Sequence, residues 1–315
     1  MANIINYQER RPVWNGLGKD VSHCTTVDEA LFDSGLDFNV YQTDIITDEL
    51  YPIPLNGFKA NVKEGAVPGS GTPLGIVSTK YSVIQNSTAF AFLNSLVAEG
   101  MKFERAGGLQ NGRKVFILAR MPDRYIISGE SISPYIVFIN SFDGSGAVKI
   151  LMTPVRMICL NMLNLALRKT LRSWSAVHCG DVVGKLEDAK NTLIYADRYM
   201  QELGAAIEDM KHQTITDAKV IELTDALYPT NDKMTDIQLR NIGQQRNDLL
   251  ERYFHAPDLE PMKKTAYRFI NAVSDHATHA DPIRRRENYD ESLFLRSVEG
   301  NPLVDRAFSL LSAAA

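Results

Sequence analysis

The middle of the chain changes from a helical pattern of hydrophobic residues to an alternating one. Asn86 can cap a helix whose apolar residues recur at helical spacing, and Gly100 can end it. Two strand-like runs then flank Asn111-Gly112, a dipeptide typical of tight β-hairpins. The runs ISPYIVFINS and AVKILM lie on either side of the turn DGSG and predict a second hairpin. We therefore expect one helix followed by an antiparallel β-meander of four strands.

The apolar stretch after the fourth strand predicts a long helix over residues 154–172. Thr153 is a suitable N-cap, and proline is favoured at the first helical position, which Pro154 would occupy. At 100° per residue, four polar residues fall within about 80° of arc. They are Asn161, Asn164, Arg168 and Arg172. Buried polar side chains need partners, so the stripe indicates either a groove for an anionic ligand or an internal hydrogen-bond network between domains or subunits.

The two ends of the chain have different patterns. Residues 1–80 contain several prolines and look irregular, and the glycine-rich stretch at 65–75 lacks the lysine and hydroxyl of a phosphate-binding loop. Beyond about residue 180 the apolar spacing is helical, and further helices are expected at 216–227, 235–254, 262–277 and 301–312. We expect an α+β fold in which helices flank the antiparallel β-meander. Its core would span 1–178, followed by an acidic, all-helical region at 179–315.

The net charge of −4 hides an uneven distribution. Residues 101–175 contain eleven cations and four acids, a local balance of +7 that leaves −11 for the remainder. A basic segment within an acidic chain is typical of a site for polyanions such as nucleic acids. The alternative is that these cations pair with acids elsewhere in the fold or in a neighbouring subunit.

The first hairpin can be analysed residue by residue, because a two-residue loop determines its register. The expected pairs are Leu109 with Lys114, Gly107 with Phe116, Arg105 with Leu118 and Phe103 with Arg120. These eight residues would share one face, on which aromatic and basic side chains interleave, as on a platform that stacks bases and holds phosphates. The alternative is an amphipathic face that is wetted at its edges or packs against another subunit.

The hairpin, the fourth strand and the expected helix together define a candidate nucleic-acid groove. Its residues are Phe103, Arg105, Lys114, Phe116, Arg120, Lys149, Arg156, Asn161, Asn164, Arg168, Lys169 and Arg172. Arg156 lies off the polar stripe, near the positive end of the expected helix, and could add to the same potential.

Patterns typical of enzymes are weak. Cys24, Cys159 and Cys179 are scattered, so we expect free thiols rather than a disulfide framework or a metal site. His178-Cys179 and the two histidines within 275–281 lack the further residues that a catalytic or metal site needs. We therefore expect no enzyme, no metal and no cofactor. With no signal-peptide-like or membrane-spanning run, we expect a cytoplasmic protein.

Several short motifs resemble those of one known family. They are Trp14-Asn15-Gly16-Leu17-Gly18, Tyr81-Ser82-Val83-Ile84-Gln85-Asn86, Ala106-Gly107-Gly108-Leu109, Asn140-Ser141-Phe142-Asp143-Gly144-Ser145, Thr153-Pro154-Val155-Arg156 and Cys159-Leu160-Asn161. The set resembles the phage/plasmid-like protein family, also called domain of unknown function 932, over most of the chain. Met162 departs from the family pattern, which has Thr there. The resemblance implies a phage or mobile-element origin and no established catalytic residues.

The expected element order is also similar, more distantly, to the core of single-strand annealing proteins of the RecT/Redβ/Erf class. That similarity implies a ring or filament that binds a single strand in a basic groove between sheet and helix, although a shared fold does not establish function. The leading hypothesis is therefore an oligomeric protein that binds or anneals single-stranded nucleic acid, with DNA favoured. An alternative is a phage interaction or anti-defence protein that binds a host protein through its acidic helical half. Two further hypotheses are a purely structural oligomer and an unrecognised enzyme.

Overall fold

An antiparallel sheet of eight strands forms the centre of the computed structural model, with its strands in the order β1-β5-β6-β8-β9-β10. Two further strands pair at its sides, β7 with β8 and β11 with β9. The strands are β1 Lys19–Asp20, β5 Lys102–Leu109, β6 Lys114–Arg120, β7 Tyr125–Ile127, β8 Glu130–Ser141, β9 Val148–Arg156, β10 Asn161–Met162 and β11 Ser173–Ala176. The structure describes residues 5–67, 69–122, 125–127, 129–158, 160–165, 167, 173–180, 184 and 190–313. The expected antiparallel meander is confirmed.

The hairpin between β5 and β6 forms where it was expected. Leu109 pairs with Lys114 and Gly107 with Phe116, and the turn residues Asn111 and Gly112 have φ values of 59° and 83°. A bulge between Phe103 and Arg105 then shifts the register, so that Phe103 pairs with Ala119. The expected pairing of Phe103 with Arg120 is wrong. Since one extra residue reverses the face of every side chain beyond a bulge, Phe103 lies on the opposite face from Phe116.

The helix expected over 154–172 is wrong. Thr153 to Arg156 continue β9, and Asn161 and Met162 form β10, which pairs back onto β9 through a turn at Leu160 (φ 59°). Side chains of β9 are buried on both faces of the sheet, so this strand is apolar at almost every position. A continuous apolar run of this kind fits a buried strand and a buried helix equally well.

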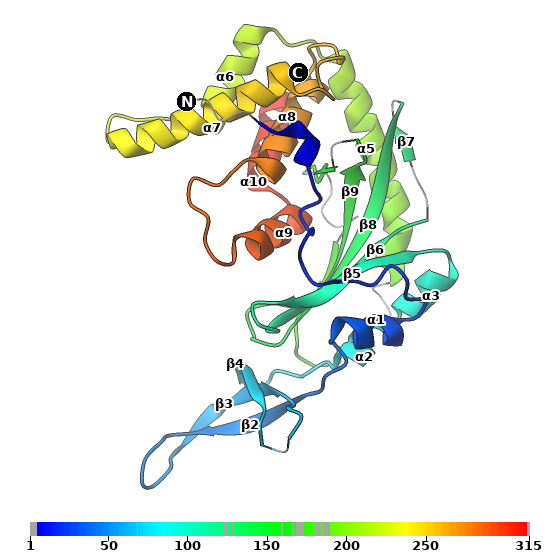
Figure 1. The fold of residues 1–315 in the computed structure, drawn as a ribbon, viewed down its shortest axis with the longest axis vertical. Coiled ribbons are helices and arrows are strands. Elements are labelled where there is room, and N and C mark those ends of the chain that lie inside the picture. Colours follow the sequence, from blue (N-terminus) through cyan, green and yellow to red (C-terminus); the bar gives the residue numbers. More distant parts are fainter. Residues whose placement is uncertain are drawn as a thin grey trace.

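Helices and the N-terminal segment cover both faces of the central sheet (Figure 1). One face packs against α1 Val27–Ser34, α2 Asn86–Phe90 and α3 Leu93–Ala98. The last two replace the single helix expected from Asn86, and Gly100 ends them with a φ of 98°. The other face packs against Trp14 and α9 Tyr289–Glu299. A short 3-10 helix, Tyr7–Glu9, precedes Trp14 in the N-terminal segment.

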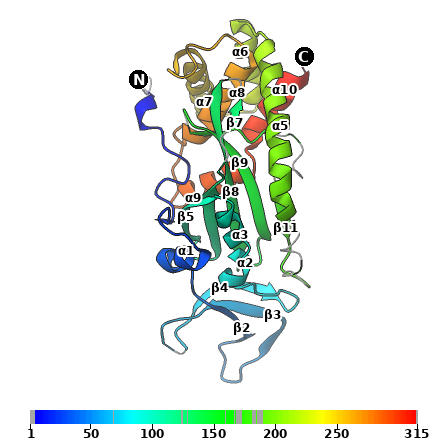
Figure 2. The ribbon, with the colours of Figure 1, turned by 90° about the vertical axis from the view of Figure 1, so that its right-hand side faces the viewer.

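The C-terminal half is helical, as expected, and packs on one end of the sheet (Figure 2). Its helices are α5 Lys190–His212, α6 Asp217–Leu227, α7 Asp236–His255, α8 Ala266–His279 and α10 Pro302–Ala313. Helix α8 is buried among the others, and α5 runs along the sheet with Gly204 close to Ile127. Among the described residues, no helix combines the length and apolarity that crossing a membrane would require.

A separate three-stranded sheet, in the order β2-β3-β4, projects from the opposite end of the molecule (Figure 1). It consists of β2 Val40–Ile46, β3 Pro54–Lys63 and β4 Thr72–Ser78, and we call residues 40–78 the arm. The expectation that residues 1–80 are irregular is therefore wrong. The two prolines within strands of the arm are compatible with this structure, because Pro54 is the first residue of β3 and Pro73 lies in the edge strand β4.

Candidate functional site

The two aromatic residues of the candidate groove do not form a stacking platform. Phe103 is 2% exposed and packs beneath α1 to α3, whereas Phe116 is fully buried on the opposite face of the sheet. The Phe116 ring lies 4.9 Å from the ring of Phe294 in α9. The predicted shared face of Phe103 and Phe116 is wrong, because the bulge in β5 separates them and helices cover both sides.

Several cations of the candidate groove bind partners within the molecule. Arg105 donates from Nε to the Leu17 carbonyl (2.6 Å) and from Nη2 to the Gly18 carbonyl (3.1 Å). Lys149 Nζ pairs with Glu299 Oε1 at 2.7 Å. Two more cations are partly buried: Lys114, whose charge acts on Asp143, and Arg120 at the end of β6. The contacts of Arg105 and Lys149 tie the N-terminal segment and α9 to the sheet.

The residues expected on the polar helix are dispersed. Asn164 is buried and donates from Nδ2 to the Ser297 carbonyl at 2.6 Å. Asn161 lies in β10, opposite Arg156. Arg168, Lys169 and Arg172 lie outside the described residues. The single polar stripe is wrong, because its described members belong to a strand and a connecting segment rather than to one helix.

Arg156 is the start of a buried network of ion pairs. It is 1% exposed and donates from Nε to Glu130 Oε2 and from Nη1 to Asp258 Oδ2, each at 2.5 Å. The hydroxyl of Tyr267 donates to the same Glu130 oxygen at 2.9 Å. The arginine thus has acidic partners from β8 and from the connection between α7 and α8. For this residue, the alternative that cations of the basic segment pair with acids elsewhere in the fold is confirmed.

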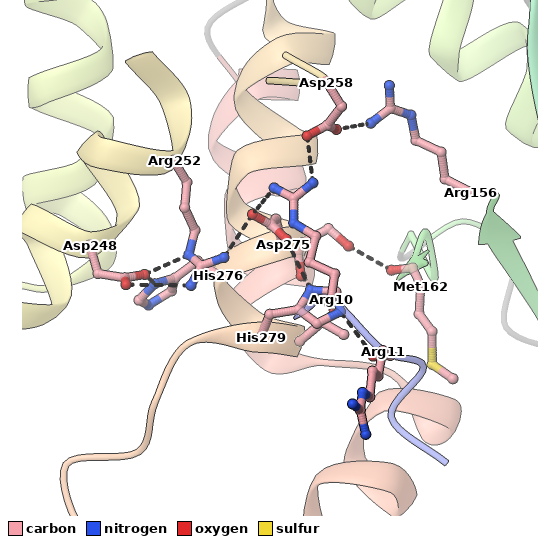
Figure 3. Close-up of polar contacts among 12 residues, drawn as sticks. Arg10, Arg11, Arg156, Met162, Asp248, Arg252, Asp258, Asp275, His276 and His279 are labelled. Atoms are coloured by element: carbon pink, nitrogen blue, oxygen red, sulfur yellow. Dashed lines mark hydrogen bonds and ion pairs between the residues drawn. The ribbon is translucent and has the colours of Figure 1, made fainter. Parts of the chain in front are cut away.

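The network continues through the N-terminal segment into the helices (Figure 3). Arg10 donates to Asp258 Oδ1 at 2.5 Å and to Asp275 Oδ2 at 2.7 Å. Arg252 reaches the same Asp275 oxygen at 2.8 Å and pairs with Asp248 at 2.7 Å. Because these side chains alternate in charge and are largely buried, each neutralises its neighbours. The arrangement fastens the N-terminal segment and the sheet to α7 and α8.

The two histidines of α8 belong to this network as well. His276 Nδ1 lies 2.5 Å from Asp248 Oδ2, and His279 Nδ1 lies 2.9 Å from Asp275 Oδ1. Their other ring nitrogens contact the Tyr228 hydroxyl and the Arg11 carbonyl. Since every ring nitrogen has a partner, these histidines serve the network rather than a shared metal ion.

The network predicts a specific loss of stability in acid. Burial would raise the pKa of the Asp275 carboxyl, but the hydrogen bond from His279 and the charges of Arg252 and Arg10 lower it to about 2, from an ordinary 3.8. A carboxyl with a lowered folded pKa stabilises the fold above its ordinary pKa, and this contribution is lost as pH falls through the folded pKa. We expect Asp275 to contribute about 2 kcal/mol that disappears between about pH 4 and pH 2.

Urea unfolding at stepped pH, with the parent and an Asp275→Asn variant, measures this contribution. The variant should be less stable near neutral pH, and its free energy of unfolding should depend less on pH within the acid window. If the free energy of unfolding depended equally on pH in the two proteins, Asp275 would not be the source of the acid-dependent stability.

The inner face of the arm rests on the central body. Asn61 donates from Nδ2 to the Phe142 carbonyl at 2.6 Å, and Gln42 donates from Nε2 to the Tyr81 carbonyl at 3.3 Å. Val77 is buried on the same face. The Asn61 contact anchors the arm to the turn between β8 and β9, and the Gln42 contact joins it to the connection between β4 and α2.

The outer face of the arm is uncharged and carries three exposed apolar side chains. Tyr41, Phe58 and Ile76 come from its three strands and are 44%, 47% and 61% exposed. The register places the following side chains on this face: Tyr41, Thr43, Phe58, Ala60, Val62, Ile76 and Ser78. None of these seven is charged, whereas Asp44 and Lys59 pair on the inner face at 2.6 Å. A one-layer sheet with an apolar outer face normally packs against a second layer.

The tip of the arm extends this surface. The exposed apolar residues around the connection between β2 and β3 are Ile46, Leu50, Tyr51, Ile53 and Leu55. Backbone and side-chain hydrogen bonds between Thr47 and Ile53 close the connection. The arm therefore combines a defined backbone with a concentration of exposed apolar side chains, which is typical of a binding surface.

A family model for a domain of unknown function, DUF932, matches residues 73–298. The chain belongs to the DUF932 family. In this chain the DUF932 match begins in β4 and ends in α9, so it includes the central sheet apart from β1 and most of the buried network. The comparison with curated proteins and the comparison with solved structures each found no match. The more distant similarity to single-strand annealing proteins stays a prediction.

One weak catalytic motif lies within the DUF932 match. His178 is buried, stacks on Tyr81 with ring centroids 4.6 Å apart, and has its Nδ1 3.2 Å from the Ser82 carbonyl. Cys179 beside it is exposed. The His178 ring is thus held against the chain by stacking, and it contacts a backbone carbonyl rather than the neighbouring thiol.

Two groups of candidate functional residues were not predicted from the sequence, and most of their members lie before the DUF932 match. The first is the outer face of the arm, whose alternation in YQTDII and FKANV was a usable strand signal. The second is a group of metal-ligating side chains, His23, Cys24 and Asp33, in and beside α1. Nothing in the sequence indicated a metal site at Cys24, because Asp33 lies nine positions further along the chain and approaches the thiol only in the fold.

Proposed function

We propose that this DUF932 protein is a self-assembling interaction protein whose binding surface is the outer face of the arm. The observation that carries the proposal is the exposure of Tyr41, Phe58 and Ile76 on one face of a sheet that has a single layer. A three-stranded sheet needs a covered apolar face for lasting stability. A protein of phage or mobile-element origin, which the family resemblance implies, would use such assembly to present its acidic helical end to a host protein.

The occupant that fits this face best is a second copy of the chain. Uncharged side chains can meet their own symmetry mates without repulsion, and the seven outer-face residues carry no charge. Two such sheets packed face to face would form a sandwich with about 10 Å between layers. The position of Asp44 and Lys59 on the inner face supports the same arrangement, since a twofold contact through the outer face leaves these charges outside the interface.

Sedimentation velocity of the full chain over a range of concentrations tests this proposal. We expect a reversible monomer–dimer equilibrium at micromolar concentrations that is retained at high salt, because apolar burial is not screened by ions. A strict monomer at all concentrations would contradict it. Single-stranded DNA binding stays a separate prediction, and adding an oligonucleotide in the same experiment would detect it as a faster species that disappears as salt rises.

A further inference from the structure

Three different metal-ligating side chains converge beside α1. His23 and Cys24 lie in the connection before the helix, and Asp33 lies near its end. His23 Nε2 is 2.6 Å from Asp33 Oδ2 and 3.7 Å from Cys24 Sγ, and the sulfur is 3.6 Å from the same carboxylate oxygen. One nitrogen, one sulfur and one oxygen therefore form a small triangle.

The backbone around these residues is well defined. The Cys24 N–H donates to the Val21 carbonyl at 3.0 Å, and Val21 is fully buried. A capping box between Thr26 and Glu29 then begins α1 directly after the two ligand positions. Because the connection and the helix start are held by these hydrogen bonds, the three side chains are presented from a preformed framework.

The triangle has nearly the dimensions of a tetrahedral zinc site. With Zn–S of about 2.3 Å and Zn–N and Zn–O of about 2.0 to 2.1 Å, ligand atoms lie about 3.3 to 3.6 Å apart. The distances from the Cys24 sulfur to His23 and to Asp33 already agree with these ligand separations within a few tenths of an ångström. The distance between His23 and Asp33 is shorter because these groups share a hydrogen bond, which a metal ion would replace.

The same geometry argues against a nucleophilic cysteine. In a catalytic triad the two ring nitrogens of the histidine contact different partners, whereas here one nitrogen, Nε2 of His23, lies next to both the sulfur of Cys24 and the carboxylate of Asp33. Burial and the Asp33 carboxylate also raise the pKa of the Cys24 thiol to about 11, so the metal-free thiol is a poor nucleophile at neutral pH.

The site opens onto a depression of about 570 Å³ on the surface. Its lining includes the three ligand residues together with Asp28 and Phe32. A metal ion bound by three protein ligands would therefore keep one position accessible to water or to a small ligand.

We propose that His23, Cys24 and Asp33 bind one zinc ion, or another divalent transition metal of similar preference, in a tetrahedral site with one open position. Thiolate, imidazole and carboxylate together suit zinc and cobalt better than magnesium or calcium, which prefer oxygen ligands. The site is independent of the arm and of the proposed self-assembly.

Cobalt titration of the metal-free full chain tests the proposal, because Co²⁺ bound to a thiolate has a charge-transfer absorption that oxygen and nitrogen sites lack. We expect the band to saturate at one equivalent and to disappear when Zn²⁺ is added. Cys24→Ser should abolish the band, whereas Cys179→Ser, which changes an exposed cysteine elsewhere, should retain it. His23→Gln, at an exposed side chain, should weaken binding about tenfold or more while circular dichroism stays unchanged.

Any one of three results would overturn the metal site. The first is the absence of a thiolate band in the parent at a small excess of Co²⁺. The second is a band that persists in Cys24→Ser. The third is an affinity for Co²⁺ that does not change in folded His23→Gln.

Discussion

An Arg156→Ala variant is expected to lose about 3 to 5 kcal/mol of its free energy of unfolding. The guanidinium is buried between Glu130 and Asp258, with 2.5 Å to each. Truncation would leave the carboxylates of Glu130 and Asp258 in the interior without the positive charge of Arg156. The free-energy cost of an unpaired buried charge exceeds the stabilisation that the ion pair provides. Urea unfolding followed by circular dichroism would measure the loss.

Arg285→Ala is the matched control for this prediction. Arg285 pairs with Asp290 at 2.7 Å, but both side chains are more than half exposed. Exposed ion pairs contribute little to stability because water and salt screen them, so this variant should be close to the parent. If the two variants lost equal stability, burial would not be the reason that Arg156 matters.

The double variant Phe58→Glu/Ile76→Glu is expected to weaken self-association by about 100-fold or more. Each side chain would lose roughly 1.5 to 3 kcal/mol of burial, and every substitution occurs twice in a twofold interface. Four new carboxylates would also face one another across the contact. Both residues are exposed within one chain, so the fold of the monomer should be retained.

Ile237→Glu is the control for the arm. Ile237 in α7 has the same 61% exposure as Ile76, so the two substitutions remove equally exposed isoleucines and add the same charge. The control should associate like the parent in sedimentation equilibrium. If it dissociates as readily as the arm variant, general repulsion rather than a specific surface explains the result.

Local signals in the sequence were sufficient for the turn of the β5–β6 hairpin and for most C-terminal helices, although α9 was not among the expected ones. Asn111-Gly112 can adopt the left-handed conformations of a tight turn, so the turn and the first pairs follow from two residues. Helices such as α6 and α7 begin at Thr216 and Thr235, whose side chains cap them. In each case the information lies within a few positions along the chain.

Tertiary contacts decide the features that were predicted wrongly. The segment around Arg156 is a strand because helices and the N-terminal segment cover both faces of the sheet, which no local pattern reveals. The arginine is neutralised by an acid 26 positions before it and another 102 positions after it. The bulge that turns Phe103 away from Phe116 also has no local signature. Arg156 therefore contributes to an internal ion-pair network rather than to a basic surface.

Photo-crosslinking from the outer face of the arm can show whether two copies of the chain meet through this surface. Photoreactive benzoylphenylalanine would replace Phe58 in unlabelled chains, which are then mixed with ¹⁵N-labelled parent so that mass spectrometry distinguishes contacts between copies. We expect crosslinks from position 58 to the outer-face residues of β2, β3 or β4 in the labelled copy. The absence of crosslinks between copies, or their location on the helical region, would contradict it.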